Sequence, residues 1–258
     1  MSGSLTIVGL GPGDVDRTTP IVAQVLREAT DLVGYATYLN RVPLGEHDQH
    51  RHASDNRFEL DRARHALQLA SEGRNVVVVS GGDPGVFAMA AAVFEAVATG
   101  EPRWRTLPIR VEPGVTAMLA AAAEVGAPLG GDFCAISLSD NLKSWTTITR
   151  RLEAAARGDF VIALYNPASK SRPHQLGEAF ALLRQWKAPG TVVVFVHAAG
   201  SKDAAVHVTT LEDADSHVAD MRTLVLVGAA STRVLSREGT TPWVYTPRSE
   251  EVAGCARS

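Results

Sequence analysis

Residues 75–87 read NVVVVSGGDPGVF. The four consecutive valines are typical of a short strand that is buried on both faces, as in a parallel sheet. The two glycines that follow allow a sharp turn and a close approach of the backbone to a ligand. Asp83 can cap the next helix, and Pro84 suits its first turn. This order of strand, glycine turn and capped helix predicts a ligand site at the carboxyl end of the strand. The alternative is an ordinary tight turn between a strand and a helix. The motif alone does not identify the ligand.

The length and composition indicate a globular protein. The chain has 258 residues, of which 45% are hydrophobic and 21% charged, which suits one large domain or two smaller ones. Its formal net charge of −3 argues against a general nucleic-acid binder. The two cysteines, Cys134 and Cys255, lie far apart and in no metal-ligand spacing, so we expect no disulfide framework and a reducing, cytoplasmic compartment. We expect no signal peptide, and no membrane span, since no apolar stretch reaches about 18 residues.

A second glycine turn follows the first predicted strand, Leu5–Leu10. The loop at 9–14, GLGPGD, does not match the dinucleotide fingerprint G-x-G-x-x-G, because its third glycine comes too early and Pro12 intrudes. The second strand closes with Gly34 and Tyr35 rather than with an acidic residue, and the chain has no G-x-x-x-x-G-K-[ST] motif. We therefore expect neither an NAD nor an ATP phosphate site here. The loop is a rigid turn that can lie against a flat ligand.

Strand and helix patterns alternate along the rest of the chain. Apolar runs predict further strands that begin at 109, 133, 159, 191, 205 and 223. Helical patterns cover 18–29, 57–73, 116–125 and 175–187, follow Pro84, and surround Trp145. This alternation predicts parallel or mixed sheets with helices on both faces. The turn at 128–131, PLGG, is a candidate break between two α/β domains, and we expect a cleft between these domains.

The polar stretch 41–64 holds three histidines, His47, His50 and His52, and four arginines, Arg51, Arg57, Arg62 and Arg64. The histidines could bind a metal, but no acidic or cysteine residue completes a ligand set, and we expect no metal site. Guanidinium groups pair bidentately with carboxylates, so this cluster in an acidic protein suggests a polyanionic ligand. For Arg62 and Arg64, the solvent-exposed face of a helix is an equally good explanation.

Four short motifs occur in a specific order along the chain: GLGPGD at 9–14, GGDP at 81–84, EPGVTA at 112–117 and LYNP at 164–167. With these motifs the sequence resembles the tetrapyrrole methylases, S-adenosylmethionine enzymes that methylate corrin and porphyrin precursors. Longer strings resemble the branch that acts on C17 of precorrin-3B: HASDNR at 52–57, VSGGDPGVFAMA at 79–90, ISLSDNL at 136–142 and ALYNPAS at 163–169. The resemblance runs from Leu5 to about Val244. Phe58 stands where that branch has an acidic residue, and the tail after Thr246 matches no part of the family.

The resemblance implies two αβα domains, which we place at residues 1–115 and 116–258, and a homodimer. It implies that S-adenosylmethionine lies in the cleft between the domains and gives its methyl group to C17 of precorrin-3B, leaving S-adenosylhomocysteine. The macrocycle contracts as C20 is extruded from the ring, and precorrin-4 results, in cobalamin (vitamin B12) biosynthesis. Methyl transfer from a sulfonium requires in-line positioning, which can lower the barrier by ~7 kcal/mol or more, and requires no metal.

Residue roles follow from the matched motifs. The cofactor residues implied by the family are Pro12, Gly81, Gly82, Asp83, Phe87, Thr116, Ala117, Tyr165, Asn166, Gly228 and Ala229. The tetrapyrrole carries many carboxylates, and we expect a basic rim to grip them, formed by Arg51, Arg57, Lys170 and Arg172.

Two acidic residues are candidates for proton transfer, since the C20 hydroxyl group must lose a proton as its carbon leaves the ring. Asp14 ends the first glycine loop, and Asp140 follows the strand that begins at 133. Each could instead cap the helix after its turn, and a carboxylate of the substrate could accept the proton.

Other functions stay open at this stage. A sibling methylase that acts on another carbon, or on the cobalt-containing cobalt-factor III, would share the same cofactor motifs. A tetrapyrrole-binding protein without catalysis is disfavoured by the cofactor loops, which the chain retains. An NAD(P) oxidoreductase is disfavoured by the failed dinucleotide fingerprint.

Overall fold

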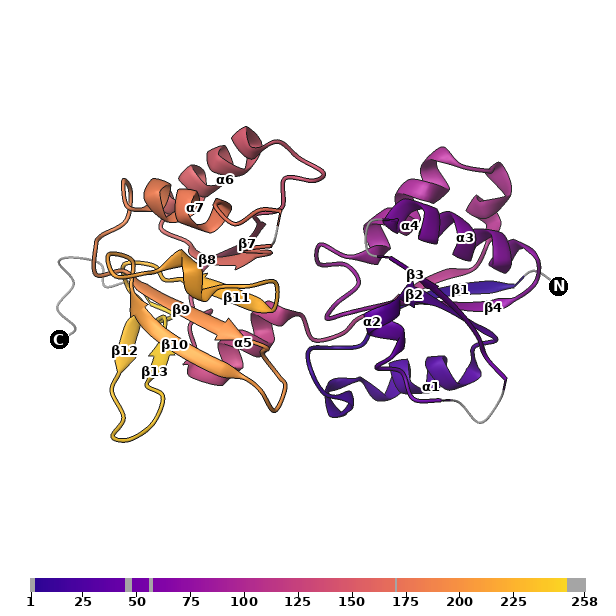
Figure 1. Cartoon of the computed structure of the whole chain (residues 1–258), viewed down its shortest axis with the longest axis horizontal. Coiled ribbons are helices and arrows are strands. Elements are labelled where there is room, and N and C mark those ends of the chain that lie inside the picture. Colours follow the sequence, from indigo (N-terminus) through magenta and orange to yellow (C-terminus); the bar gives the residue numbers. More distant parts are fainter. Residues whose placement is uncertain (1–2, 45–47, 56–57, 170, 250–258) are drawn as a thin grey trace. The chain divides into compact units, whose positions relative to one another are not determined.

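The computed structural model describes residues 3–44, 48–55, 58–169 and 171–249. The chain divides into two compact units, Met1–Ala117 and Met118–Ser258. Each unit has its own five-stranded sheet with helices packed on it (Figure 1). The predicted α/β class with parallel and mixed sheets is therefore confirmed.

The sheet of unit 1 is entirely parallel, with the strand order β3-β2-β4-β1-β5. Its strands are β1 (Ser4–Gly9), β2 (Asp31–Tyr35), β3 (His50–Ser54), β4 (Asn75–Ser80) and β5 (Ile109–Glu112). Strand β3 lies in the polar stretch 41–64, for which we predicted no strand; an edge strand with no buried side chain has no apolar pattern to reveal it. Because the strands are parallel, all five carboxyl ends lie at one edge of the sheet.

The consecutive valines of β4 are explained by cores on both faces of this sheet. Val76 and Val78 pack with α3 (Glu59–Ser71), α4 (Met89–Thr99) and the 3₁₀ turn η2 (Pro102–Thr106). Val77 and Val79 pack on the other face with α1 (Pro20–Glu28) and α2 (Ala36–Leu39). The short 3₁₀ turn η1 (Val15–Arg17) precedes α1 in the chain. A strand that is covered on both faces needs apolar side chains at every position.

The sheet of unit 2 is mixed, with the order β10-β9-β11-β8-β7. Its strands are β7 (Phe133–Ser137), β8 (Val161–Tyr165), β9 (Val192–His197), β10 (Ala205–Thr210) and β11 (Thr223–Val227). Strands β7 and β8 are parallel, whereas β11 is antiparallel to both β8 and β9. The carboxyl ends of β7, β8 and β9 therefore share one edge with the amino end of β11.

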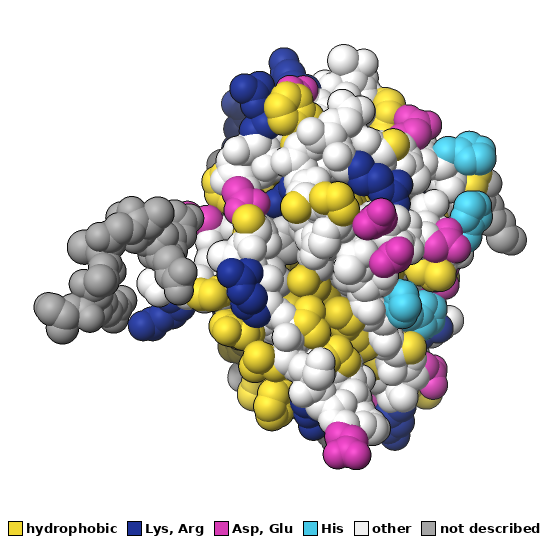
Figure 2. Space-filling model, turned by 90° about the vertical axis from the view of Figure 1, so that its left-hand side faces the viewer, with side chains coloured by type: hydrophobic (Ala, Val, Ile, Leu, Met, Phe, Trp, Pro, Cys, Tyr) yellow, Lys and Arg dark blue, Asp and Glu magenta, His cyan; other side chains and the backbone are white. Residues whose placement is uncertain are grey.

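Unit 2 also contains a small sheet that the sequence did not predict. It joins β6 (Gly126–Ala127), β12 (Arg233–Leu235) and β13 (Trp243–Tyr245) in the order β12-β13-β6. Leu235 and Trp243 are 48% and 52% exposed. Figure 2 looks onto unit 2 and shows hydrophobic side chains gathered over the lower part of this face.

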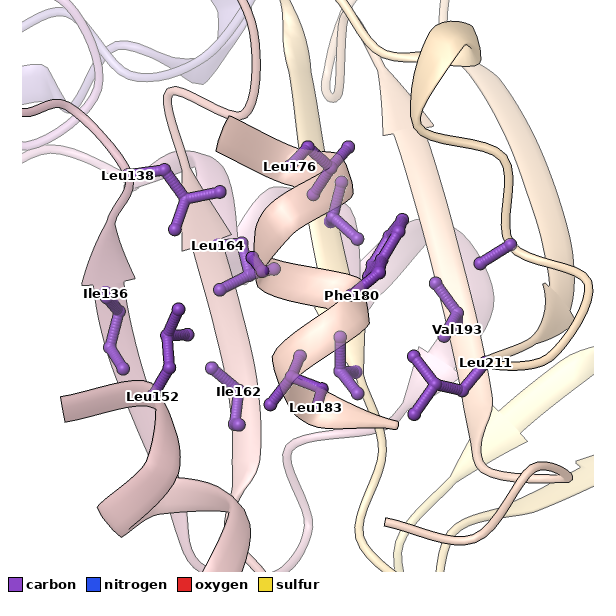
Figure 3. Close-up of a cluster of buried hydrophobic side chains, with 14 of the residues drawn as sticks. Ile136, Leu138, Leu152, Ile162, Leu164, Leu176, Phe180, Leu183, Val193 and Leu211 are labelled. Carbon is purple, nitrogen blue, oxygen red and sulfur yellow. The ribbon is translucent and has the colours of Figure 1, made fainter. Parts of the chain in front are cut away.

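Three helices and one 3₁₀ turn complete unit 2. Helix α5 (Ala117–Val125) lies on one side of the sheet, and α6 (Trp145–Arg157) and α7 (Gln175–Leu183) lie on the other (Figure 1). The 3₁₀ turn is η3 (Ser216–Val218). Leu176, in the first turn of α7, belongs to the same fully buried cluster as Leu138 and Leu164 (Figure 3). The start of α7 thus lies at the edge where β7 and β8 end. Within the described residues, no helix has the length and apolar character needed to cross a bilayer.

Candidate functional site

Three of the predicted motifs meet at the carboxyl edge of the sheet in unit 1. The loops after β1, β4 and β5 are neighbours there, because the strand order places β1 between β4 and β5. The backbone N–H of Gly11 donates to the Gly82 carbonyl (3.1 Å), and the Gly82 N–H donates to the Gly11 carbonyl (3.2 Å). A side chain on Gly9 would place its Cβ only 2.8 Å from Gly114 N, and closer still to the Gly82 carbonyl oxygen. These turns can pack together only if Gly9 has no side chain.

The two glycines of the 81–84 motif are required for different reasons. Gly82 has φ +61°, a left-handed conformation that favours glycine. A Cβ at Gly81 would lie 2.7 Å from the aromatic ring of Tyr38. Gly81 therefore makes room for a side chain of the protein itself, a role that the sequence pattern did not reveal.

Asp83 does not cap the next helix, contrary to our expectation. Helix α4 begins only at Met89, with Ala88 at its N-cap position. The Asp83 carboxylate instead accepts hydrogen bonds from Gly85 N (2.8 Å, Oδ1) and Gly114 N (3.1 Å, Oδ2). It fastens the turn after β4 to the loop after β5.

The remaining predicted cofactor residues of unit 1 lie on the same loops. Phe87 has φ +52° and is half exposed, so the turn after β4 presents an aromatic ring to its surroundings. A left-handed conformation is uncommon for a bulky residue and often marks a functional turn. Thr116 is buried directly before Ala117, the first residue of α5, and Pro12 is buried in the loop after β1.

In unit 2, the predicted LYNP motif forms a second turn at a carboxyl edge. The Tyr165 hydroxyl accepts a hydrogen bond from the backbone N–H of Met118 (3.0 Å). Asn166 follows with φ +52° and donates from Nδ2 to the Ser137 hydroxyl oxygen (2.9 Å). The ends of β7 and β8 and the first turn of α5 are thereby tied together.

Gly228 and Ala229 lie elsewhere in unit 2. Strand β11 is antiparallel to β8, and Val227 pairs with Ile162, so the turn after β11 lies at the amino end of β8. At about 3.4 Å per residue, this is roughly 14 Å along the strand from Tyr165. The expectation that these two residues share a site with Tyr165 came from the family match alone, and the strand pairing places them at the opposite edge of this sheet. The β11 residue at the Tyr165 edge is Thr223, which pairs with His197.

Residues 4–215 match the family model described as Tetrapyrrole (Corrin/Porphyrin) Methylases. The chain belongs to this family. It is 55% identical to the precorrin-3B C(17)-methyltransferase of Sinorhizobium sp over 96% of this chain and 97% of that protein. It is 40% identical to the probable cobalt-factor III C(17)-methyltransferase of Salmonella typhimurium, over 94% of this chain and 99% of that protein. The resemblance that the four motifs predicted is confirmed.

Solved structures agree with this assignment. The crystal structure of the methyltransferase CobJ superposes with a TM-score of 0.90 and 55% identity, covering 95% of this chain and 100% of that chain. A uroporphyrin-III C-methyl transferase from Thermus thermophilus, complexed with S-adenosylhomocysteine, has a TM-score of 0.67 and 22% identity, covering 88% of this chain and 97% of that chain. The second match shows a shared fold.

Asp14 lines a cavity of about 490 Å³ within unit 1 of this methylase. It stands at the N-cap position of η1, but its side chain makes no capping hydrogen bond with the described residues. Arg41 lines the same cavity and donates to the Gly11 carbonyl (2.9 Å). Burial lowers the pKa of Arg41, although Tyr38 and Asp14 act in the opposite direction. The capping alternative therefore does not apply to Asp14.

Asp140 is exposed in the loop after β7. Helix α6 is capped by Ser144, whose hydroxyl accepts from Thr147 N (3.3 Å). The capping alternative therefore does not apply to Asp140 either.

Of the four basic residues that we expected to bind the carboxylates of the substrate, the structure describes two, Arg51 and Arg172. Arg51 donates from Nη1 to the carbonyls of Leu39 (2.9 Å) and Val42 (3.2 Å), and from Nη2 to those of Val42 (3.2 Å) and Pro43 (2.8 Å). Its terminal donors already hold the chain after α2, so Arg51 has a structural role in place of the expected one. Arg57 and Lys170 lie outside the described residues.

Arg172 differs from Arg51 in its hydrogen bonding. Its Nε and Nη1 atoms are buried and have no hydrogen-bond partner among the described residues. Arg62, for which an exposed helix face was the alternative, is buried and donates to the Ser54 hydroxyl (2.8 Å) and the Asp55 carbonyl (2.6 Å).

His52 belongs to a hydrogen-bond network around the buried Asp31. Its Nε2 lies 2.8 Å from an oxygen of Asp31, which is fully buried, and its Nδ1 lies 3.0 Å from His65 Nε2. Arg74 Nε lies 2.5 Å from the other Asp31 oxygen. Burial raises the pKa of Asp31, but hydrogen bonds from Thr30, His52 and Arg74 outweigh it and lower the pKa overall. Among the described residues, no group of three histidine, cysteine or acidic side chains could hold a metal ion.

Proposed function

We propose that this protein is an S-adenosylmethionine-dependent methyltransferase that methylates C17 of precorrin-3B in cobalamin biosynthesis. The observation that carries the proposal is 55% identity to a precorrin-3B C(17)-methyltransferase over nearly the full length of both chains. In this reaction the macrocycle contracts to precorrin-4 and S-adenosylhomocysteine is released.

The turns of unit 1 support a cofactor site. The loops after β1, β4 and β5 are locked by the Gly11–Gly82 hydrogen bonds and by the Asp83 carboxylate, so their main-chain groups are held in place before a ligand arrives. The exposed ring of Phe87 offers a flat apolar surface for an adenosine ring. S-adenosylmethionine, when bound, supplies an electrophilic methyl group. In unit 1 we assign its binding to main-chain groups of Gly81, Gly82 and Asp83 together with Pro12, Phe87 and Thr116. The family match implies a further role for Tyr165 and Asn166.

The protein's contribution to catalysis is positioning. A rigid set of turns holds the methyl donor without reorganisation at the moment of reaction, which is the type of contribution that in-line transfer requires. Asp14 and Asp140 are the candidate acceptors for the proton of the C20 hydroxyl group. Asp14 is partly buried beside Arg41, whereas Asp140 is exposed.

Incubation with precorrin-3B and methyl-labelled S-adenosylmethionine tests the proposal. A labelled, ring-contracted product is expected, with the label at C17. Label at another carbon, or a methylated product that is not contracted, would indicate a sibling activity. S-adenosylhomocysteine binding with no turnover of any tetrapyrrole would favour a binding protein without catalysis.

The cobalt-containing substrate is the second candidate. The cobalt-factor III relative has 40% identity, compared with 55% for the precorrin-3B relative. Parallel assays with precorrin-3B and cobalt-factor III at equal concentration decide between them. We expect a higher kcat/KM for the metal-free substrate.

We further propose that the protein is a cytoplasmic homodimer. The exposed apolar side chains of the β12–β13 hairpin support self-association, because exposed apolar surface of this kind often marks an interface (Figure 2). Light scattering should give twice the 27.4 kDa mass of one chain. A single-chain mass at micromolar concentration would contradict the dimer.

A further inference from the structure

Arg172, just before α7, and Gln175, its first residue, are half-buried side chains with polar atoms that are buried and lack hydrogen-bond partners among the described residues. Nε and Nη1 of Arg172 and Oε1 of Gln175 each expose less than 1 Å² and have no partner among the described residues. Buried polar groups in folded proteins are nearly always paired, and a charged group costs most when it is not. A guanidinium with two buried nitrogens that lack acceptors therefore calls for an explanation.

The backbone holds Arg172 in a defined place. Ser169 and Arg172 exchange two main-chain hydrogen bonds, Ser169 N to the Arg172 carbonyl (3.1 Å) and Arg172 N to the Ser169 carbonyl (3.0 Å). This closes the loop between Asn166 and α7 into a tight turn. Arg172 is thus positioned by the fold even though part of its guanidinium group is unpaired.

Other arginines of this protein are held by carbonyl groups. Arg184, at the opposite end of α7, donates to the carbonyls of Leu211 (2.9 Å) and Ala214 (3.1 Å). Arg51 donates to three carbonyls in unit 1. The chain therefore provides acceptors where arginine has a structural role, and among the described residues it provides none for Nε and Nη1 of Arg172.

The unpaired groups lie at the edge of the sheet that carries the Tyr165–Asn166 turn. Leu176, the residue after Gln175, packs in one buried cluster with Leu138 and Leu164, which mark the ends of β7 and β8 (Figure 3). The start of α7 is consequently beside the strand ends that carry the LYNP motif.

We propose that Arg172 and Gln175 form a ligand subsite that binds a carboxylate with a neighbouring hydrogen-bond donor. The guanidinium donates to the carboxylate, and the Gln175 side-chain carbonyl accepts from an adjacent N–H or O–H group. The proposal rests on the proposed function, in which two ligands carry this chemistry. The tetrapyrrole has several carboxylates, and the methionine part of S-adenosylmethionine has one carboxylate beside an ammonium group.

Two substitutions test the subsite. Arg172→Met keeps the apolar stem and removes the unpaired donors. Gln175→Glu keeps the size of the side chain and places a negative charge that repels a carboxylate ligand. Arg150→Met, on the exposed face of α6, is the matched control for loss of a positive charge. Each protein is assayed by calorimetry with S-adenosylhomocysteine, by KM for precorrin-3B, and by its thermal unfolding midpoint without ligand.

We expect each of the two variants to raise either the Kd for S-adenosylhomocysteine or the KM for precorrin-3B at least tenfold. The ligand that is affected identifies the source of the carboxylate. The unfolding midpoint of ligand-free Arg172→Met should stay the same or rise, because the variant removes two buried nitrogens that have no acceptor among the described residues. A merely structural arginine would show the opposite, a lower midpoint.

Unchanged Kd and KM in folded variants would overturn the subsite, as would a lower midpoint of Arg172→Met together with equal losses for both ligands. The wild-type protein is assayed first. If it neither binds S-adenosylhomocysteine nor methylates precorrin-3B, the proposed function fails and the subsite fails with it. If the wild type is active and the variants match it, only the subsite fails.

Discussion

Gly9→Ala should damage the cofactor site although it changes one hydrogen atom to a methyl group. The new Cβ would lie 2.8 Å from both Gly114 N and Pro84 Cδ, and closer still to the Gly82 carbonyl oxygen. Carbon atoms do not approach backbone atoms to less than about 3.0 Å without displacement. All three neighbours belong to turns that the substitution must push apart, and none is the flexible end of a long side chain.

The cost can be estimated from overpacking. One extra methyl group in a well-packed place usually costs about 1–3 kcal/mol. Displacement of the turn after β4 should also weaken binding of S-adenosylhomocysteine at least tenfold, about 1.4 kcal/mol. Denaturant unfolding measures the first effect, and calorimetry on the folded variant measures the second.

Gly190→Ala is the matched control, since a Cβ at Gly190 would meet nothing within 4 Å. It should leave both measurements unchanged. If Gly9→Ala also leaves stability and affinity unchanged, the three loops are not packed as described, and the reasoning for the cofactor site is wrong.

Three further predictions concern Gly82, Asp31 and Asp140. Gly82→Val places a β-branched residue at φ +61°, which should cost about 1–2 kcal/mol of stability and weaken S-adenosylhomocysteine binding tenfold or more; unchanged calorimetry would contradict this. Because the pKa of Asp31 is lowered in the folded protein, its ionised form stabilises the fold above the ordinary value of about 3.9, and this stabilisation is lost as pH falls through the lowered pKa. Asp31→Asn should therefore lower the unfolding midpoint more at pH 7 than at pH 3, and an equal loss at both would refute the account. Asp140→Asn should bind both ligands normally and turn over slowly; a wild-type rate would show that Asp140 is not the base.

Much of the fold could be predicted from local patterns. The valine run of β4 predicted a strand that is covered on both faces, and Val76–Val79 alternate between two cores. The motifs at 9–14, 81–84 and 112–117 were expected to serve one site, and parallel strand order brings them to one edge. The strand and the turns could be predicted because a buried strand and a glycine turn depend on residues that are close in the sequence, whereas the shared ligand site stays a prediction.

Side-chain partners were the part that the pattern could not supply. Asp83 was expected to cap a helix and instead bonds Gly85 and Gly114. Arg51 was expected to grip a ligand and instead holds the chain after α2. An aspartate or an arginine can take several hydrogen-bond partners, and which one it meets depends on residues far along the chain.

Strand direction was likewise decided by the tertiary structure. The apolar run at 223–227 predicts a strand, but nothing in it states whether the strand is parallel to β8. Because β11 is antiparallel, Gly228 and Ala229 lie at the edge opposite Tyr165. The sequence by itself determined the class of fold, the family and the turns at strand ends, since these are properties of short segments. The tertiary structure alone decided which turns share an edge and which partners the charged groups of the described residues meet, because both depend on long-range packing.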